Sequence, residues 1–368
     1  MSTIFTRILP CRSPAKDEVE KRLFLLYNSR FVGIFIARGV FVFSPYPIRF
    51  KEIYKEVVWG GSRLKTLLGK AIPSARTGES WEISDHGADT SAVAGGAFTG
   101  ETLRTLCEKR PREILGSALA AKHRQRFPLL LKFIDANDTL SVQVHPDDEY
   151  ARKHGKGESG KPEAWYIVAA EPGSRLIKGL KHGTKKDDFK RLLKAGRVEE
   201  CLNSFAVFPG DVIHVPAGTV HAIGAGILLA EIQQTSDLTY RVYDWNRVGL
   251  DGKPRETHLE KALDVINFDG RDDSAKIASP PGPGIQRMAE CKQLALDVIT
   301  LEGGSFESVT GGERFEILCA VEGRGSVAWG GGKTDFAAGT SFLIPAAIGH
   351  YSITSDGRCR VLRSCVPE

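Results

Sequence analysis

The chain has 368 residues, 42% of them apolar and 26% charged, which is typical of a globular protein with a sizeable core. The net charge is only +5, and no block of Lys and Arg with interleaved aromatic residues is present, so nucleic-acid binding has little support. The seven cysteines are scattered without a Cys-x-x-Cys pair, which favours a reducing compartment such as the cytoplasm.

Residues 1–45 read as an atypical N-terminal extension. Its apolar run at 31–43 has 13 residues and contains Arg38, so it is too short and too charged to span a bilayer. The run lies too deep for a signal peptide, and the acidic stretch at 17–20 is untypical of a transit peptide. We expect no membrane association. Our hypothesis is that translation starts downstream of the assigned first residue.

The following segment predicts several short elements. We expect an opening strand after residue 46, a glycine-rich turn at 59–61 and an amphipathic stretch near 101–120. A short strand near 79–86 carries four notable side chains, Glu79, Trp81, Glu82 and His86. We expect the indole of this strand to be buried in the core, and we leave the role of the histidine open.

The first candidate ligands follow an apolar run at 128–136. Gln143 and His145 are two positions apart on a β-type alternation, so they share one face of a strand. Glu163 opens a second predicted strand, 163–170, which is rich in aromatic and β-branched residues. Because Gln143 and His145 share one strand face, both can point into a cavity with apolar walls.

A turn motif supplies the last candidate ligand. Gly210, Pro216, Gly218 and His221 follow the spacing Gly-x5-Pro-x-Gly-x2-His between two short apolar runs. This spacing resembles the second motif of the cupins, which are double-sheet barrels that usually hold one metal. Two imidazoles, a carboxylate and an amide oxygen suit zinc or another first-row divalent metal. Each of these four candidate ligands alone has an ordinary structural explanation. The metal hypothesis depends on all four occurring together in the cupin order and spacing.

Beyond this region, residues 184–203 predict helix. Thr184 and Asp187 have the spacing of a capping box, and Gly196 is expected to end the first helix before a second, shorter one. We expect the helix to pack against the barrel, with a lid as the alternative role.

The C-terminal part repeats the turn motif in degraded form. A proline- and glycine-rich linker is expected at 279–284. Residues 339–350 then reproduce the turn spacing and end in His350, but the upstream partner strand has only Glu316 to mimic the acidic ligand. We predict a mainly β chain of two cupin (jelly-roll) barrels with a few short helices. The catalytic cupin domain spans 46–270, and a degenerate barrel without metal spans 285–368.

The motifs at 78–86, 140–151, 160–168 and 208–247 together resemble type I mannose-6-phosphate isomerases, in particular the short bacterial form. The similarity covers about residues 46–270 strongly. It implies one zinc ion per chain on Gln143, His145, Glu163 and His221. It further implies an essential arginine at Arg241, the motif lysine at Lys161, and a serine linked with substrate phosphate at Ser141.

The implied reaction interconverts D-mannose 6-phosphate and D-fructose 6-phosphate through an enediol(ate), so the partner would be a small sugar phosphate. A divalent metal suits this chemistry as a Lewis acid, and Arg241 can add fixed positive charge. The base stays open among Glu163, Glu231, Lys161 and a metal-bound water. A structural carboxylate that pairs with Arg241 or another cation is an equal interpretation of Glu231.

Two other functions remain as alternatives. One is another metal-dependent cupin, either a different sugar-phosphate isomerase or an iron dioxygenase. The other is a sugar-binding barrel without catalysis, which the presence of the ligands and Arg241 disfavours. The sequence leaves the oligomeric state open.

Overall fold

The computed structural model describes residues 44–269 and 282–367. The predicted N-terminal extension therefore lies almost wholly outside the described residues, as does half of the predicted linker, residues 279–281. Residues 45–368 cluster as one compact unit, and the predicted division into two domains stays a prediction. Within the described ranges, no helix is both long and apolar enough to cross a membrane.

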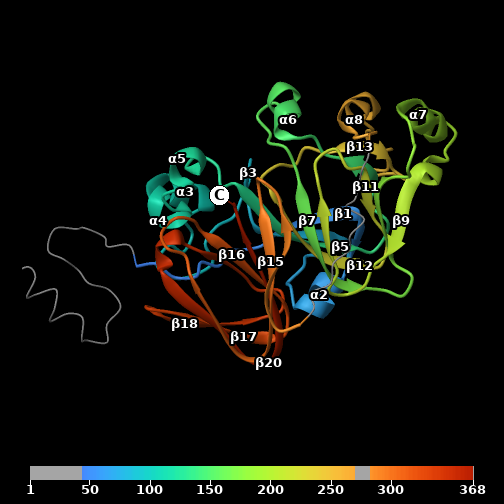
Figure 1. Cartoon of the computed structure of the whole chain (residues 1–368). Helices are drawn as coiled ribbons and strands as arrows, with labels where there is room; N and C mark the ends of the chain where they lie inside the picture. The colour runs from blue at the N-terminus through green and yellow to red at the C-terminus, as the bar shows by residue number, and fades with distance from the viewer. Residues whose placement is uncertain (1–43, 270–281, 368) are drawn as a thin grey trace, which may run out of the picture. The chain divides into compact units, whose positions relative to one another are not determined.

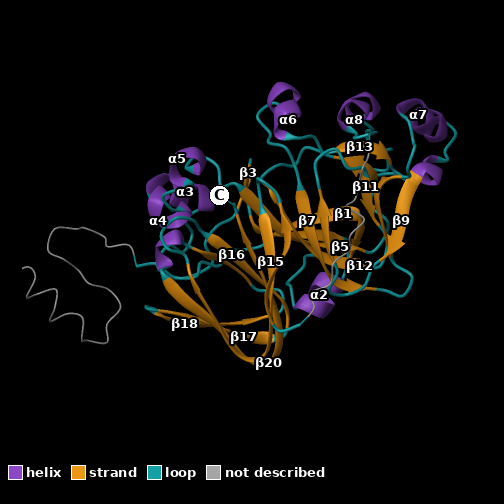
Figure 2. Cartoon of the chain, in the orientation of Figure 1, coloured by secondary structure: helices purple, strands orange, loops and turns teal. Residues whose placement is uncertain are grey.

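Two antiparallel sheets carry the first part of the unit (Figures 1 and 2). The first sheet has, in spatial order, β1 (Ile53–Gly61), β2 (Thr77–Ile83), β5 (Leu129–Ala136), β12 (Ile227–Gln234), β7 (Glu163–Ala170) and β10 (Val212–Val215). The second sheet has β13 (Tyr240–Tyr243), β6 (Val142–Val144), β11 (His221–Ile223), β8 (Arg175–Leu180) and β9 (Leu202–Ala206). A short ribbon pairs β3 (Asp85–His86) with β4 (Asp89–Thr90).

A third sheet follows in the C-terminal part. Its order is β14 (Gly284–Glu290), β15 (Ala295–Val309), β20 (His350–Cys365), β16 (Glu316–Glu322) and β19 (Ser341–Ile344). In addition, β17 (Arg324–Trp329) pairs with β20, and β18 (Gly332–Ala337) pairs with β17. The short 3-10 helix η3 (Ala346–Ile348) precedes β20. Two contacts join this sheet to the first part: Ile48 bridges Leu343, and Arg360 Nη1 donates to Tyr166 Oη at 3.2 Å.

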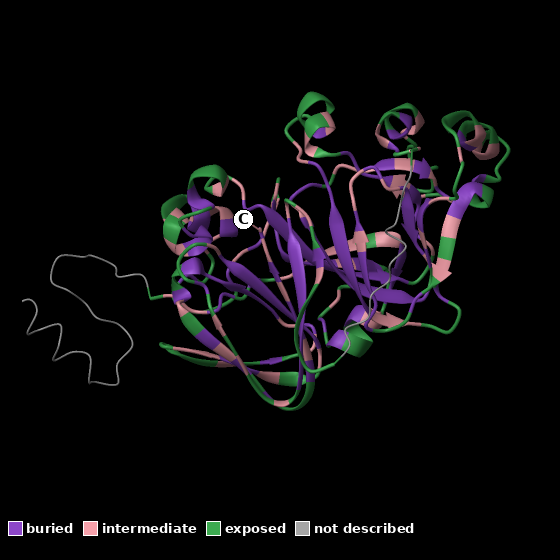
Figure 3. Ribbon diagram, in the orientation of Figure 1, coloured by how far each residue is buried: buried purple, intermediate pink, exposed green. Residues whose placement is uncertain are grey.

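The helices are short and lie at the ends and outer faces of the sheets, with their exposed sides outward (Figure 3). They are α2 (Arg63–Leu68), α3 (Leu103–Lys109), α4 (Pro111–Leu115), α5 (Ala120–His123), α6 (Asp148–His154), α7 (Lys186–Lys194) and α8 (Leu259–Val265). The mainly β, cupin-type fold with short helices is confirmed. The sheets of the described residues are open, however, and do not close into barrels.

The apolar core lies between the first two sheets. Trp165, Ile213 and Leu229 of the first sheet pack there against Leu176 and Ile223 of the second. A second cluster covers the other face of the second sheet, where it meets α7 and α8. In the first sheet, β5 and β12 are buried at almost every position, which explains their long apolar runs.

Three local predictions are wrong. Residues 59–61 are not a turn, because β1 continues through Gly61; a Cβ atom at Gly60 would lie 2.2 Å from Arg76 O, so close strand packing explains this glycine. Thr184 forms no capping box, since its hydroxyl donates to Lys181 O (2.7 Å) and α7 begins after Lys185 without a side-chain cap. His86 is not on the strand of Trp81 but on β3.

Other local predictions are confirmed. Gly196, with φ +68°, follows the end of α7. The shorter helix after it is the 3-10 helix η1 (Val198–Cys201). Trp81 is buried, at 3% exposure.

Candidate metal centre

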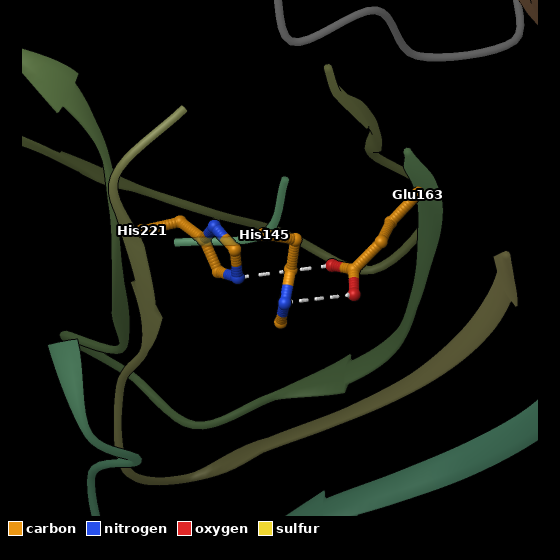
Figure 4. Close-up of side chains that lie close together, drawn as sticks. All are labelled: His145, Glu163 and His221. Carbon is orange, nitrogen blue, oxygen red and sulfur yellow. Dashed lines mark ion pairs between the residues drawn. The ribbon is translucent and has the colours of Figure 1, made fainter. Parts of the chain in front are cut away.

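Three buried side chains meet between the first two sheets (Figure 4). His145 Nε2 lies 3.2 Å from Glu163 Oε1, and His221 Nε2 lies 3.8 Å from Glu163 Oε2. The candidate ligand atoms all lie within 4.8 Å of one another. Among the residues that the structure describes, this is the only group of three His, Cys, Asp or Glu side chains close enough to hold a metal.

Strand ends position these ligands. Glu163 is the first residue of β7, His221 is the first of β11, and His145 directly follows β6. The turn between β10 and β11 is held by Gly218, whose N–H donates to His145 O at 2.8 Å. The predicted strand alternation and turn therefore deliver three of the four expected ligands to one point.

Both histidines offer a lone pair at Nε2. His145 Nδ1 donates to Leu238 O and His221 Nδ1 donates to Thr219 O, each at 2.9 Å, as metal-binding histidines commonly do. Burial lowers the pKa of His221 to about 3 and also lowers the pKa of His145, so both rings are neutral. A neutral ring that donates through Nδ1 cannot also donate through Nε2.

Glu163 is the charged member of the group. Burial alone would raise its pKa, but Lys161 and the two histidines outweigh this effect, and the pKa lies well below its ordinary value. Its Oε1 atom is buried and lies 3.0 Å from Lys161 Nζ. Two imidazole nitrogens and a carboxylate thus face one another, which is a donor set that divalent metals bind in proteins. The residues present therefore fit a divalent metal.

Gln143 reaches the same point from β6. It pairs with His221 across β6 and β11, and its amide Nε2 lies 3.3 Å from His221 Nε2. Rotation of the amide by 180° exchanges its nitrogen and oxygen, so the end group can present either atom. Ser141, which is 3% exposed, donates to Gln143 Oε1 at 3.4 Å. The expected phosphate residue thus contacts an expected ligand.

The two expected basic residues differ in position. Lys161 Nζ lies 3.0 Å from Glu163 Oε1 and 3.4 Å from His145 Nε2, inside the group and 3% exposed. Arg241 pairs with Gln143 across β13 and β6, so the two side chains lie on one sheet face. Burial, then Arg255, lowers the pKa of Arg241.

A buried ionic network lies beside the ligands. Trp165 Nε1 donates to both Glu163 Oε2 (3.1 Å) and Glu231 Oε2 (2.8 Å). Glu231 Oε1 pairs with Lys132 Nζ at 2.9 Å, and Lys132 also pairs with Glu79 at 3.4 Å. The cation that binds Glu231 is thus Lys132 rather than Arg241. Sequence reasoning missed Lys132, whose signal was one charge within an apolar run.

The remaining candidates of the 79–86 segment lie apart from the ligands. Glu82 binds Lys70 (2.6 Å) and Ser80, and His86 Nε2 lies 2.8 Å from Glu158 Oε1. Neither belongs to the three-residue group.

The fold and this site together define a cupin-type candidate metal centre. Residues 48–168 match the model of the phosphomannose isomerase type I catalytic domain, and residues 285–366 match the mannose-6-phosphate isomerase cupin domain. Mannose-6-phosphate isomerase ManA from Bacillus subtilis is 37% identical over 317 residues, which cover 86% of this chain and 98% of that protein. The chain therefore belongs to the type I mannose-6-phosphate isomerase family.

Solved structures agree with this assignment. The crystal structure of mannose 6-phosphate isomerase from Bacillus subtilis aligns with a TM-score of 0.78 at 34% identity, covering 86% of this chain and 99% of that one. A putative mannosephosphate isomerase from Archaeoglobus fulgidus aligns with a TM-score of 0.71 at 28% identity, covering 87% of this chain and 98% of that one.

Proposed function

We propose that this protein interconverts D-mannose 6-phosphate and D-fructose 6-phosphate with one zinc ion held by Gln143, His145, Glu163 and His221. The observation that carries the proposal is the convergence of two neutral Nε2 atoms on one buried carboxylate, with all candidate ligand atoms within 4.8 Å of one another. Family membership supplies the substrate, because the matched relatives carry that activity in their names.

The reaction moves a proton between two neighbouring carbons, and the negative charge of the enediolate must be stabilised. A bound divalent ion would supply Lewis-acid polarisation of the substrate's adjacent oxygens. Arg241 lies on the same sheet face as Gln143, where its guanidinium adds positive charge near the developing oxyanion. Its Nη1 donates to Glu256 O at 2.7 Å, which holds the guanidinium in place.

Two groups beside the ligands have roles that their contacts suggest. Lys161 keeps Glu163 ionised and holds positive charge next to the reacting carbons. Glu231 is tied to Lys132 and Trp165, and in our proposal it orients the ligand Glu163 through the shared indole.

The substrate is a free sugar phosphate, and we propose that the enzyme works in the cytoplasm. The six described cysteines are all free, which suits a reducing compartment.

The test is a coupled assay for fructose 6-phosphate formed from mannose 6-phosphate, on purified protein before and after chelation, with zinc returned. We expect activity that disappears with the chelator and returns with zinc. Zinc-loaded protein without activity would overturn the proposal.

One observation keeps a second candidate in view. Two histidines and one carboxylate also form the ligand set of many non-haem iron oxygenases. Adding back iron(II) instead of zinc, with oxygen consumption as the readout, separates the two. Oxygen uptake with a sugar phosphate would favour the iron enzyme.

A further inference from the structure

One carboxylate outside the ligand group joins the two segments that carry His145 and Glu163. Asp148 is the first residue of α6, three positions after His145. Its Oδ1 accepts the backbone N–H of Gly160 at 2.9 Å, and Gly160 lies three positions before Glu163. The hydrogen bond therefore spans the gap between the two ligand-bearing segments.

The same carboxylate binds two further elements. Its Oδ1 also accepts from Gln234 Nε2 (3.0 Å) at the end of β12, and its Oδ2 accepts from Gln293 Nε2 (2.9 Å). Gln293 lies in the turn between β14 and β15, in the C-terminal sheet. Donors from three separate parts of the chain thus converge on Asp148.

The two ligand-bearing segments are also in direct backbone contact. Lys161 N–H donates to Pro146 O at 3.0 Å. A Cβ atom at Gly160 would lie 2.5 Å from Asp148 N, so only glycine permits this approach. With such close packing, the loss of one hydrogen bond shifts one segment relative to the other.

Partial burial alone would raise the pKa of Asp148, but the hydrogen bonds from Gln293, Gly160 and Gln234 outweigh it, and the pKa lies below its ordinary value. The side chain is therefore an ionised acceptor for all three donors, and charge-assisted hydrogen bonds of this kind are stronger than neutral ones.

We propose that Asp148 is a positioning residue that sets the separation of His145 and Glu163, and that Gln293 extends this support into the C-terminal sheet. The inference rests on the proposed metal site. The C-terminal sheet then has a role in the first part of the molecule although it carries no ligand, because Gln293 helps to hold Asp148 in place. Ligands held at a fixed spacing bind metal more tightly than ligands that must first be ordered.

The experiment compares zinc affinity, by competition with a chromophoric chelator, in five full-length variants. Asp148→Ala removes all three hydrogen bonds, and we expect a zinc Kd raised roughly 10- to 100-fold, the range for losing an outer-shell partner. Asp148→Asn keeps Oδ1 for Gly160 and Gln234, and a flipped Gln293 amide accepts from the new Nδ2, so the Kd should stay near wild type. Gln293→Ala should raise the Kd by about threefold, as one of three bonds is lost.

Glu149→Ala is the matched control, because Glu149 is on the same helix, is exposed, and forms an ion pair with Lys153 on the outer side of that helix. Its zinc Kd should equal that of wild type. The double variant Asp148→Ala/Gln293→Ala should bind zinc as weakly as Asp148→Ala alone, since both changes remove the same bond.

Thermal unfolding separates positioning from general destabilisation. If Asp148 positions the ligands, the rise in Tm on adding zinc shrinks in Asp148→Ala. Equal loss of Tm with and without zinc, at unchanged Kd, would overturn the inference, and so would a wild type that binds no zinc. Wild-type protein that binds zinc but lacks isomerase activity would end the proposed function, while the Kd series would still decide the role of Asp148.

Discussion

The turn that ends in His221 and the turn that ends in His350 share one glycine and proline spacing, yet the two histidines have opposite environments. The side chain of His221 is 1% exposed and directs Nε2 toward Glu163. The side chain of His350 is 65% exposed and pairs with Glu307 at 3.1 Å. The spacing thus specifies a hairpin between two strands, while neighbouring residues decide whether its histidine faces a site.

The position of the left-handed residue explains the difference. Gly218, three residues before His221, has φ +83°. Its counterpart Ala347 lies in the 3-10 helix η3, and the positive φ moves to Gly349 (+72°), directly before His350. Because alanine disfavours the left-handed region, the backbone of the second turn adopts a positive φ two residues later than that of the first. His350 therefore leaves the turn on the exposed side.

The two glutamates repeat the contrast. Glu163 pairs with Val215 and Glu316 pairs with Ile344, in each case the last strand residue before the turn proline. Glu316 accepts from Tyr351 Oη at 2.6 Å and pairs with Arg363 at 3.3 Å. The neighbours of Glu316 are thus a phenol and a guanidinium, whereas Glu163 directs one oxygen at each of two imidazoles and pairs with Lys161.

The largest expected effect comes from replacing each of the two histidines and comparing zinc content and activity. His221→Ala removes one ligand, so zinc content and kcat/KM should fall together, kcat/KM by more than about 100-fold, which exceeds the cost of losing an outer-shell partner. His350→Ala should leave both unchanged. Metal analysis measures the zinc content of both variants, and the coupled assay measures their kcat/KM. An active, zinc-loaded His221→Ala protein would remove this residue from the site.

The buried ion pairs of the two regions should also differ in their contribution to stability, with Lys132 in the first region contributing more than Arg363 in the C-terminal sheet. Lys132→Ala leaves Glu231 and Glu79 without their shared cation, and we expect a loss of about 3–5 kcal/mol in the free energy of unfolding. Arg363→Ala should cost less, about 1–3 kcal/mol, because both of its carboxylate partners keep another donor: Tyr351 still donates to Glu316, and Arg287 still pairs with Asp297. Urea denaturation of both variants measures the difference. Equal losses in the free energy of unfolding would show that Lys132 contributes no more to stability than Arg363 does.

Arg241 tests whether positive charge near the site acts on turnover rather than on metal binding. Arg241→Ala should keep zinc at the wild-type level and lower kcat by about 10²–10³, as loss of one transition-state donor does. Arg358→Ala is the control from the C-terminal sheet, since its ion pairs lie with Glu302 and Glu322. Full activity of Arg241→Ala would refute its assigned role.

A glycine exchange sharpens the comparison of the turns. Gly218→Ala introduces the residue found at 347, with a Cβ atom 2.9 Å from Val265 O and a strained φ. We expect a loss of about 1–3 kcal/mol in stability and a weaker zinc Kd, because His221 follows the turn. Ala347→Gly should have no effect on zinc. A Gly218→Ala protein with wild-type stability would contradict the turn argument.

The local part of the site was predictable from sequence because it depends on short-range patterns. Strand alternation placed Gln143 and His145 on one face, and turn spacing placed His221. The network of Lys132, Trp165 and Glu231 was not predictable, because its residues are spread over about 100 positions and meet only through the register of β5, β12 and β7. Local rules also failed where a tertiary contact competed with them, as at Thr184 and Gly60.

The smallest expected effect contrasts two surface ion pairs that contain histidine. Glu158 contacts His86 (2.8 Å) and Arg126 (3.1 Å), and although partial burial raises its pKa, these partners lower it from 4.5 to about 2. Its contribution to stability is therefore complete above pH 4.5 and is lost as the pH falls toward 2. Solvent screening limits it to about 1 kcal/mol or less.

Glu158→Gln should accordingly be less stable than wild type at pH 6, and the gap should narrow between pH 4.5 and pH 3. Urea denaturation across this range measures it. Glu307→Gln, which removes the exposed partner of His350, should match wild type at every pH. A gap for Glu158→Gln that stays constant with pH would mean that the glutamate contributes through packing, because only an ionisation change makes the difference depend on protons.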